Sequence, residues 1–342
     1  MLQAVTNTNA GGPGESGTES LLSWGETYAK RWGYNPVSFD PRGVSWTKPK
    51  ASCSYTDDTT LRRRQADALG NLTETWYSWL EQNLACTIAN ENTDAKYVGS
   101  SAVVQDMMHF TELQAAARGK DPEHAVINYY GISYGTLLGQ TLVAMYPDRV
   151  GRVLLDGNVY GVAHYQGWEP SGLDDFAHGI WLFAKLCYEA GEEWCVLAEG
   201  TKSLEEVKAR FDEAVEKLRN NPINVAGERF DHNSFLSTIQ QYMYSPRQPE
   251  KGFASIANTT LSALTSDMAG VKMMKRDNPT ETSKDALGII TAVDIAGRYP
   301  WSTYEQWKAA AEKLQATAPY GAQGYASSNG YDFLPITFNR CP

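Results

Sequence analysis

A serine between two glycines joins an apolar run to a helix-like stretch, and this arrangement restricts the fold more than any other part of the sequence. Residues 124–130 form a compact, β-rich apolar run, and the residues after Gly135 have helical periodicity. Residues 151–157, "GRVLLDG", read as another buried strand. A strand, a helix and a second strand in this order predict a βαβ unit, whose parallel strands are covered by helices.

The rest of the first half continues the same alternation. Residues 2–7 and 34–40 are predicted to be strands, and residues 101–118 are predicted to be a helix with its apolar side chains near one face. Strands that alternate with helices predict an α/β fold with a parallel sheet.

The second half has a different character. The stretch "SLEEVKARFDEAVEKLRNN" begins with a predicted capping box of Ser203 and Glu206, and Ser302 with Glu305 repeats this signal further on. From about 165 to 318 the pattern indicates helices and loops without a series of strands. We therefore predict a core over residues 1–160, a helical insertion over 161–318, and a loop over 319–342 that is rich in glycine, serine and tyrosine.

The composition narrows the possible partners. The chain of 342 residues is 42% hydrophobic and 20% charged, which is ordinary for a globular protein. Its net charge of −10 argues against nucleic acid and anionic membranes as partners. No run approaches the ~18 apolar residues of a spanning helix. The start, "MLQAVTNTNAGG", lacks the basic and apolar regions of a secretory signal.

The five cysteines contain no CxxC pair, so a zinc ribbon is not expected. Cys187 and Cys195 flank a short turn-like span and could form a local disulfide. The odd count leaves one thiol over, for which Cys341 is the candidate. Residues 71–73 and 258–260 are glycosylation sequons, which matter only if the protein is exported. Nothing in the sequence indicates a metal, nucleotide or flavin cofactor.

Gly131–Gly135 fits the pattern G-x-S-x-G, in which a strained serine stands between strand and helix and a Cβ at either glycine would collide with backbone. Such a serine needs a base, an acid behind it, and donors for the oxyanion. We predict Ser133 as the nucleophile, with the backbone N–H groups of Tyr134 and of Gly12 in the "GGPG" loop as oxyanion donors. The alternatives are an ordinary serine in a βα loop and an ordinary tight turn at "GGPG".

Three separated segments, "GGPGESG", "FDPRG" and the G-x-S-x-G stretch, resemble over residues 9–160 the α/β-hydrolase branch that contains prolyl and tripeptidyl aminopeptidases. Weaker similarity continues through "LCYEAGEEWC", "QQYMYSP" and "RCP". The resemblance implies an α/β-hydrolase parallel sheet with a large helical cap, and a serine exopeptidase that acts on peptide N-termini. It also implies structural roles for Asp40 and Arg42. One departure is "GVSWT" after the arginine, where relatives usually read G-x-G-x-S.

The resemblance places the acid and the histidine after the cap, in chain order behind the serine. No Gly-His near the end, and no strand followed by aspartate, is found there, and the first two strands of the family would precede Leu2. We therefore expect a core that is incomplete at both ends. The resemblance also implies a cysteine partner for Cys341 near "TAVDIAG", which contains none. His164, which follows the strand predicted at 151–157, is the best-placed internal candidate for the base. Asp156 ends that strand, where some hydrolases carry the acid, but a structural role such as bonding loop amides is expected. His109 and His124 are predicted to be structural or solvated, and His178 and His232 are predicted to lie on the surface of the cap.

Two classes of function remain open at this point. The first is a serine hydrolase that takes a small peptide or a small ester. The second is a non-catalytic α/β-hydrolase-like protein that binds a peptide or partner, or a fragment without a function of its own. Relatives are often exported, which would suit the sequons, but the sequence predicts neither the compartment nor the oligomeric state.

Overall fold

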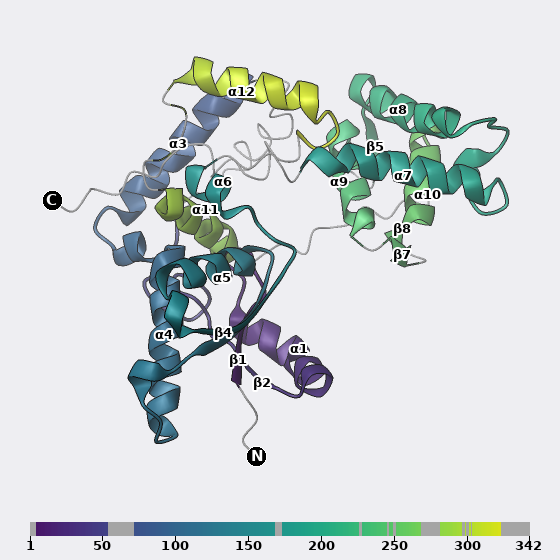
Figure 1. Cartoon of the computed structure of the whole chain (residues 1–342). Helices are drawn as coiled ribbons and strands as arrows, with labels where there is room; N and C mark the ends of the chain where they lie inside the picture. Colours follow the sequence, from purple (N-terminus) through teal and green to yellow (C-terminus); the bar gives the residue numbers. More distant parts are fainter. Residues whose placement is uncertain are drawn as a thin grey trace.

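The structure is a computed structural model that describes residues 5–53, 72–167, 173–225, 228–244, 246–248, 251–267, 281–295, 298, 301 and 303–322. It is a mixed α/β protein with a four-stranded parallel sheet and mostly helical content, as the alternation in the first half predicts. Figure 1 shows the sheet with its covering helices in one part of the molecule and a group of helices, α7 to α10, set beside it.

The sheet has the strand order β2-β1-β3-β4, and neighbouring strands are parallel. The strands are β1 (Val5–Asn9), β2 (Asn35–Val37), β3 (Ile127–Ile132) and β4 (Val150–Asp156). In the register, Asn9 lies opposite Gly131, and Ile132 lies opposite Asp156. The carboxyl ends of β1, β3 and β4 therefore meet at one edge of the sheet, which is where open parallel sheets bind ligands.

The long helices account for most of the described chain. They are α1 (Gly17–Trp32), α3 (Leu72–Asn90), α4 (Ser100–Ala117), α5 (Tyr134–Met145), α6 (Gly161–Gln166), α7 (Asp174–Ala190), α8 (Leu204–Asn220), α9 (His232–Met243), α10 (Phe253–Thr265), α11 (Glu281–Ile295) and α12 (Tyr304–Thr317). Short 3-10 turns are η2 (Asp94–Tyr97), η3 (Pro122–His124), η4 (Pro147–Arg149) and η6 (Val196–Ala198). Two antiparallel pairs join β5 (Ile223–Val225) to β6 (Glu228–Phe230) and β7 (Arg247–Gln248) to β8 (Lys251–Gly252).

Helices cover both faces of the sheet. Tyr129 on β3 is buried in one core cluster with α4 and α5. Tyr130, the next residue, contacts the rings of Tyr28 and Trp32 of α1 at centroid distances of 5.7 and 4.8 Å. Because successive side chains of a strand point to opposite faces, α1 and α5 lie on opposite sides of the sheet.

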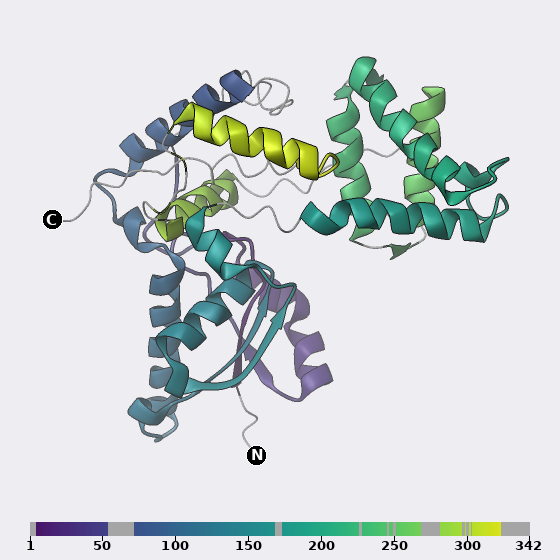
Figure 2. The same cartoon turned by 45° about the horizontal axis from the view of Figure 1, so that its top comes forward.

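Three packing clusters divide the helices of the second half. Figure 2 shows the teal and green helices α7 to α10 as a group of their own. They share a core that is centred on aromatic side chains such as Phe183, Phe211 and Phe235. Helix α11 packs instead in the cluster of the sheet, through Ile289 and Ile290 among others. Helix α12 packs against α3, with Trp307 fully buried. The limits 161–318 for a helical cap stay a prediction.

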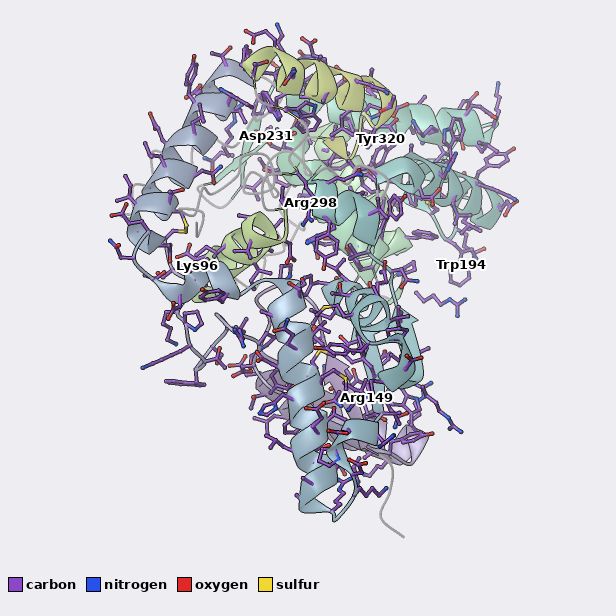
Figure 3. All side chains as sticks on the ribbon, turned by 60° about the vertical axis from the view of Figure 1, so that its left-hand side comes forward. Lys96, Arg149, Trp194, Asp231, Arg298 and Tyr320 are labelled. Carbon is purple, nitrogen blue, oxygen red and sulfur yellow. A yellow bond between two sulfur atoms is a disulfide. The ribbon has the colours of Figure 1, made fainter. Side chains whose placement is uncertain are left out.

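The segment after α12 returns to the α7–α10 group. Lys208 on α8 is buried, and its ammonium donates hydrogen bonds to Asp212 and to the hydroxyl of Tyr320, which lies just beyond α12 (Figure 3). The same ammonium lies 4.9 Å from the centre of the Tyr320 ring, within range of a cation–π interaction. Pairing and ring contact together compensate the buried charge.

The first turns of α8 and α12 test the two predicted capping boxes. One is confirmed in part, and the other lies at a neighbouring pair of residues. Ser203 caps α8 by accepting from the N–H of Glu206 at 3.3 Å, but the Glu206 carboxylate accepts from the N–H of Lys202 rather than from Ser203. For α12 the capping box is formed by Thr303 and Gln306. The predicted pair, Ser302 and Glu305, was therefore wrong by one residue; Ser302 lies outside the described residues.

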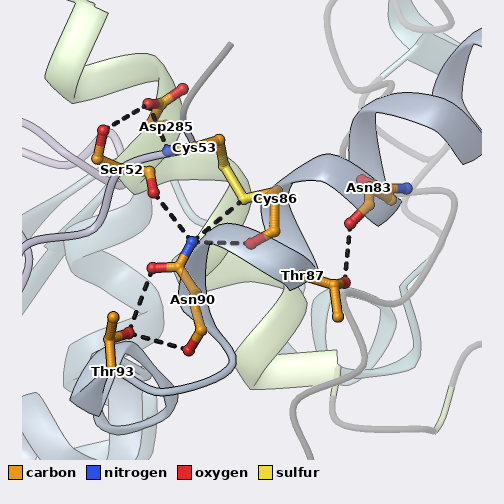
Figure 4. Close-up of a disulfide and its surroundings, with 8 residues drawn as sticks. All are labelled: Ser52, Cys53, Asn83, Cys86, Thr87, Asn90, Thr93 and Asp285. Carbon is orange, nitrogen blue, oxygen red and sulfur yellow. Dashed lines mark hydrogen bonds between the residues drawn. A yellow bond between two sulfur atoms is a disulfide. The ribbon is translucent and has the colours of Figure 1, made fainter.

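Two disulfides are present among the described residues. Cys187–Cys195 confirms the predicted local bridge. Cys53–Cys86 joins the loop after β2 to α3, and the N–H of Cys53 donates to Asp285 of α11 at 2.7 Å (Figure 4). Loop, α3 and α11 are thus held together at one point. Cys341 lies outside the described residues.

Some remaining predictions concern modification, membranes and metals. Asn258 is exposed on α10, but Thr260 of its sequon is buried and donates to the carbonyl of Ile256; Asn71 lies outside the described residues. In the part of the chain that the structure describes, no helix combines the length and apolar character needed to cross a membrane. The same part holds no group of three or more His, Cys, Asp or Glu side chains suited to a metal ion.

Candidate active site

Ser133 stands at the edge where the carboxyl ends of β1, β3 and β4 meet. It lies between the last residue of β3 and the first of α5, with φ 54° and ψ −124°, and its side chain is exposed. A positive φ is rare for residues other than glycine and costs of order 1–3 kcal/mol. The surrounding structure must therefore hold this residue in place.

The two glycines beside it have no room for a side chain. A Cβ built at Gly131 would lie 2.3 Å from the carbonyl oxygen of Gly135. A Cβ built at Gly135 would lie 2.6 Å from the carbonyl oxygen of Asn9 on β1. Both obstacles are backbone atoms, which cannot rotate away. The steric reason expected for G-x-S-x-G therefore applies at these positions.

The glycine-rich loop after β1 lies directly against this turn. A Cβ at Gly11 would be 2.9 Å from the Cβ of Ser133 and 3.2 Å from the backbone nitrogen of Tyr134. The N–H of Gly11 donates to the side chain of Asn9 at 2.9 Å, so this amide is occupied. Gly12, the predicted donor, is the next residue, with φ 104°. Tyr134 begins α5, so its N–H has no acceptor within the helix.

The backbone of Ser133 is held from both sides. Its N–H donates to the carbonyl of Asp156 at 3.0 Å, and its carbonyl accepts from the N–H and the hydroxyl of Thr136 at 2.9 and 2.6 Å. Among the residues that the structure describes, the Asp156 carboxylate accepts from the Tyr130 hydroxyl at 3.2 Å, and no bond to it from a loop amide is found. Burial and, after it, the charge of Asp156 raise the pKa of Tyr130 to about 12, so this phenol stays a donor.

The "FDPRG" segment supports the neighbouring helices. Asp40 is buried and accepts from the hydroxyl of Ser16 at 2.7 Å and the N–H of Thr18 at 3.0 Å, at the start of α1. Arg42 forms a two-pronged pair with Asp106 of α4, at 2.6 and 2.7 Å. Both residues have the structural roles that the resemblance implies.

His164 is not brought to Ser133 by any hydrogen bond among the described residues. Its Nε2 lies 3.1 Å from Oδ2 of Asp294 on α11, and the two side chains are only 13% and 2% exposed. Asp294 was missed at the sequence level, where its one signal was an acidic residue inside the apolar stretch "GIITAVDIAG".

The other four histidines have side-chain partners of their own. His109, His124 and His178 are exposed and have carboxylates of their own helix or turn nearby. The surface position predicted for His232 was wrong, because it is buried in the first turn of α9, 3.1 Å from a nitrogen of Arg219.

Comparison with known proteins gives partial matches. No family model matches the chain. Serine protease Hip1 of Mycobacterium tuberculosis is 31% identical over 158 residues, which are 44% of this chain and 28% of that protein. Tripeptidyl aminopeptidase of Streptomyces lividans is 28% identical over 225 residues, 62% of this chain and 38% of that protein. Putative hydrolase YuaR of Escherichia coli is 23% identical over 301 residues, 83% of this chain and 53% of that protein.

These relatives agree at a coarse level. All three are named as hydrolases or peptidases, which supports a hydrolase related to α/β-hydrolase-like peptidases. The chain spans between 28 and 53% of their length.

Proposed function

We propose that this chain carries the nucleophile-bearing part of a serine hydrolase with an α/β-hydrolase fold, an exopeptidase of the prolyl or tripeptidyl aminopeptidase type. The observation that supports this most is Ser133 itself. It is exposed, it has φ 54°, and it projects from the edge at which three parallel strands end. Its φ of 54° is combined with a ψ of −124°, outside the left-handed region in which Ser266 ends α10 with φ 60° and ψ 20°.

In the proposed reaction, Oγ of Ser133 attacks the carbonyl carbon of the substrate while its proton passes to a general base. The carbonyl oxygen becomes an oxyanion that accepts hydrogen bonds from the N–H groups of Gly12 and Tyr134. The amino terminus of α5 adds a favourable dipole at the same place. The leaving amine takes the proton from the base, and water then hydrolyses the acyl-enzyme.

The base and acid are proposed to come from outside the described residues. His164 is engaged with Asp294, and no described histidine donates to or accepts from Ser133. A serine without a base is a weak nucleophile.

The proposed substrate is a short peptide with a free amino terminus, in keeping with the name of the Streptomyces relative. The helices α7 to α10 would limit substrate length. Peptidyl p-nitroanilides with free and with acetylated amino termini test this. Faster release from the free form supports an exopeptidase; equal rates, or a preference for small esters, would point to an esterase instead.

A second candidate is a non-catalytic binding protein of the same fold. The observation that favours it is the lack of a histidine beside Ser133 in the described part of the chain. Labelling by a fluorophosphonate probe separates the two, because the probe reacts only with an activated serine.

The control for this experiment is Ser266, another exposed serine with a positive φ of 60°, at the end of α10. We expect only slow labelling of the wild-type chain, because no described histidine bonds to Ser133. This labelling should be lost in Ser133→Ala and retained in Ser266→Ala. A folded wild-type chain without labelling would favour the binding protein.

A further inference from the structure

A buried carboxylate near the end of α11 lies at the centre of a hydrogen-bond network. Asp294 is 4% exposed. Its Oδ1 accepts from the backbone N–H of Ser100 at 2.7 Å, and its Oδ2 accepts from the Ser100 hydroxyl at 2.5 Å and from His164 at 3.1 Å. Three donors, two of them from Ser100 at the amino terminus of α4, compensate a charge that would be costly to bury alone.

The network continues to the residue that follows Ser133. The hydroxyls of Ser100 and Tyr134 are 2.6 Å apart. A carboxylate only accepts, so the single hydroxyl proton of Ser100 goes to Asp294, and the Tyr134 hydroxyl must donate to Ser100. Burial and then the charge of Asp294 raise the pKa of Tyr134 well above its ordinary value, which keeps that proton in place.

Helix α11 packs closely against the start of α4 and against α6. A Cβ at Gly99, the N-cap residue of α4, would lie 2.7 Å from Cγ1 of Val293 and 3.0 Å from Oδ1 of Asp294. Arg298, labelled in Figure 3, donates to the carbonyl of Asp294 and, at 3.1 Å, to the carbonyl of Tyr165 on α6. These contacts fix Asp294 relative to α4 and α6. Its link to Tyr134 runs through Ser100.

We propose that Asp294 is a positioning residue, which acts through Ser100 and the Tyr134 side chain to hold the amino terminus of α5 and the strained turn at Ser133. This inference rests on the proposed function, in which the Tyr134 N–H is an oxyanion donor. A donor contributes only when it points at the place where the charge develops. Loosening its side-chain anchor should slow the reaction of Ser133.

Asp285 provides a matched control on the same helix. It is also 4% exposed and also accepts a backbone N–H at 2.7 Å, but from Cys53. Its bonds lead to the loop of the Cys53–Cys86 disulfide rather than to α5. Asp285→Asn and Asp294→Asn therefore remove the same kind of group from the same helix. In the hydrogen bonds given above for the described residues, only Asp294 belongs to the network of Tyr134.

The experiment measures two quantities on each folded variant: the rate at which a fluorophosphonate labels Ser133, and hydrogen exchange of the amides in residues 133–138. We expect labelling about tenfold slower in Asp294→Asn, because small displacements in an active site cost rate steeply, together with faster exchange. Tyr134→Phe removes only the near hydroxyl and should change both in the same direction. Asp285→Asn should match the wild-type chain in both.

Unchanged labelling and exchange in Asp294→Asn and Tyr134→Phe would overturn the proposal, as would an equal effect of Asp285→Asn. If Asp294→Asn does not fold, Tyr134→Phe decides. If the wild-type chain is not labelled, the proposed function fails. In that case hydrogen exchange alone tests whether Asp294 holds the start of α5. Faster exchange in Asp294→Asn than in Asp285→Asn supports this role, and equal exchange rejects it.

Discussion

The hydroxyl of Tyr129 on β3 donates a hydrogen bond of 2.7 Å to the carbonyl oxygen of Gly135 in the first turn of α5. This bond spans the turn that carries Ser133, because its partners lie on either side of that residue in the chain. Both partners are buried. Burial raises the pKa of Tyr129, so the phenol remains a donor. The strained serine is thus enclosed by a bond between the strand before it and the helix after it.

Replacement of Tyr129 by phenylalanine should lower the free energy of unfolding by about 1–2 kcal/mol, because the buried carbonyl of Gly135 loses its partner. Urea unfolding measures the loss. Tyr188→Phe is the control, since Tyr188 donates a similar bond of 2.8 Å to Lys202 in an exposed setting, where the loss should be below about 0.5 kcal/mol. Equal losses would contradict the structural role of Tyr129.

Gly135→Ala should lower the free energy of unfolding by roughly 3 kcal/mol or prevent folding, because the new Cβ would lie 2.6 Å from a backbone oxygen. Gly33→Ala is the control, because it places a side chain at a residue with positive φ without a steric clash. Gly33 has φ 67° and nothing within 4 Å of the added atom, so its cost should be only about 1 kcal/mol. Thermal or urea unfolding compares the two, and similar values would argue against a tight approach of β1 to α5.

Asp40 should contribute to the dependence of stability on pH. Burial alone would raise the pKa of this carboxyl, but hydrogen bonds from Ser16, Thr18 and Ser45 outweigh it and lower the pKa below its ordinary value. Its contribution is therefore present above the unfolded pKa of about 3.9 and is lost as pH falls through the lower folded pKa. Unfolding free energies between pH 5 and pH 2 should fall more steeply in the wild-type chain than in Asp40→Asn; parallel curves would contradict this.

The two disulfides should contribute differently to the free energy of unfolding. Cys187–Cys195 closes a sequence separation of 8, and Cys53–Cys86 one of 33. Chain entropy predicts losses of about 2.6 and about 3.8 kcal/mol when each pair is replaced by alanines. Denaturant unfolding of the two double variants measures the difference. A larger loss for the shorter loop would show that packing, rather than loop closure, decides the order.

Much of the sheet and its turn could be predicted because the information is local. The apolar run before Ser133, the glycines on either side and the helical periodicity after Gly135 each concern neighbours in the chain. The first strand was predicted at 2–7 and β1 is Val5–Asn9, an error in boundary rather than in type. The capping box of α12 was predicted one residue too early for a similar reason, because adjacent polar residues are nearly equal candidates for a helix cap.

Partners across long distances could not be predicted from one sequence. Asp294 and Ser100, Asp285 and Cys53, and Cys53 and Cys86 are brought together only when α11 and α3 pack on the sheet. A buried carboxylate can be compensated by any donor that packing brings near it, and sequence spacing does not record which one. The sequence by itself determined the serine turn, the parallel sheet and the helical second half. The tertiary structure alone decided which buried groups support that turn, because that choice depends on how distant helices pack.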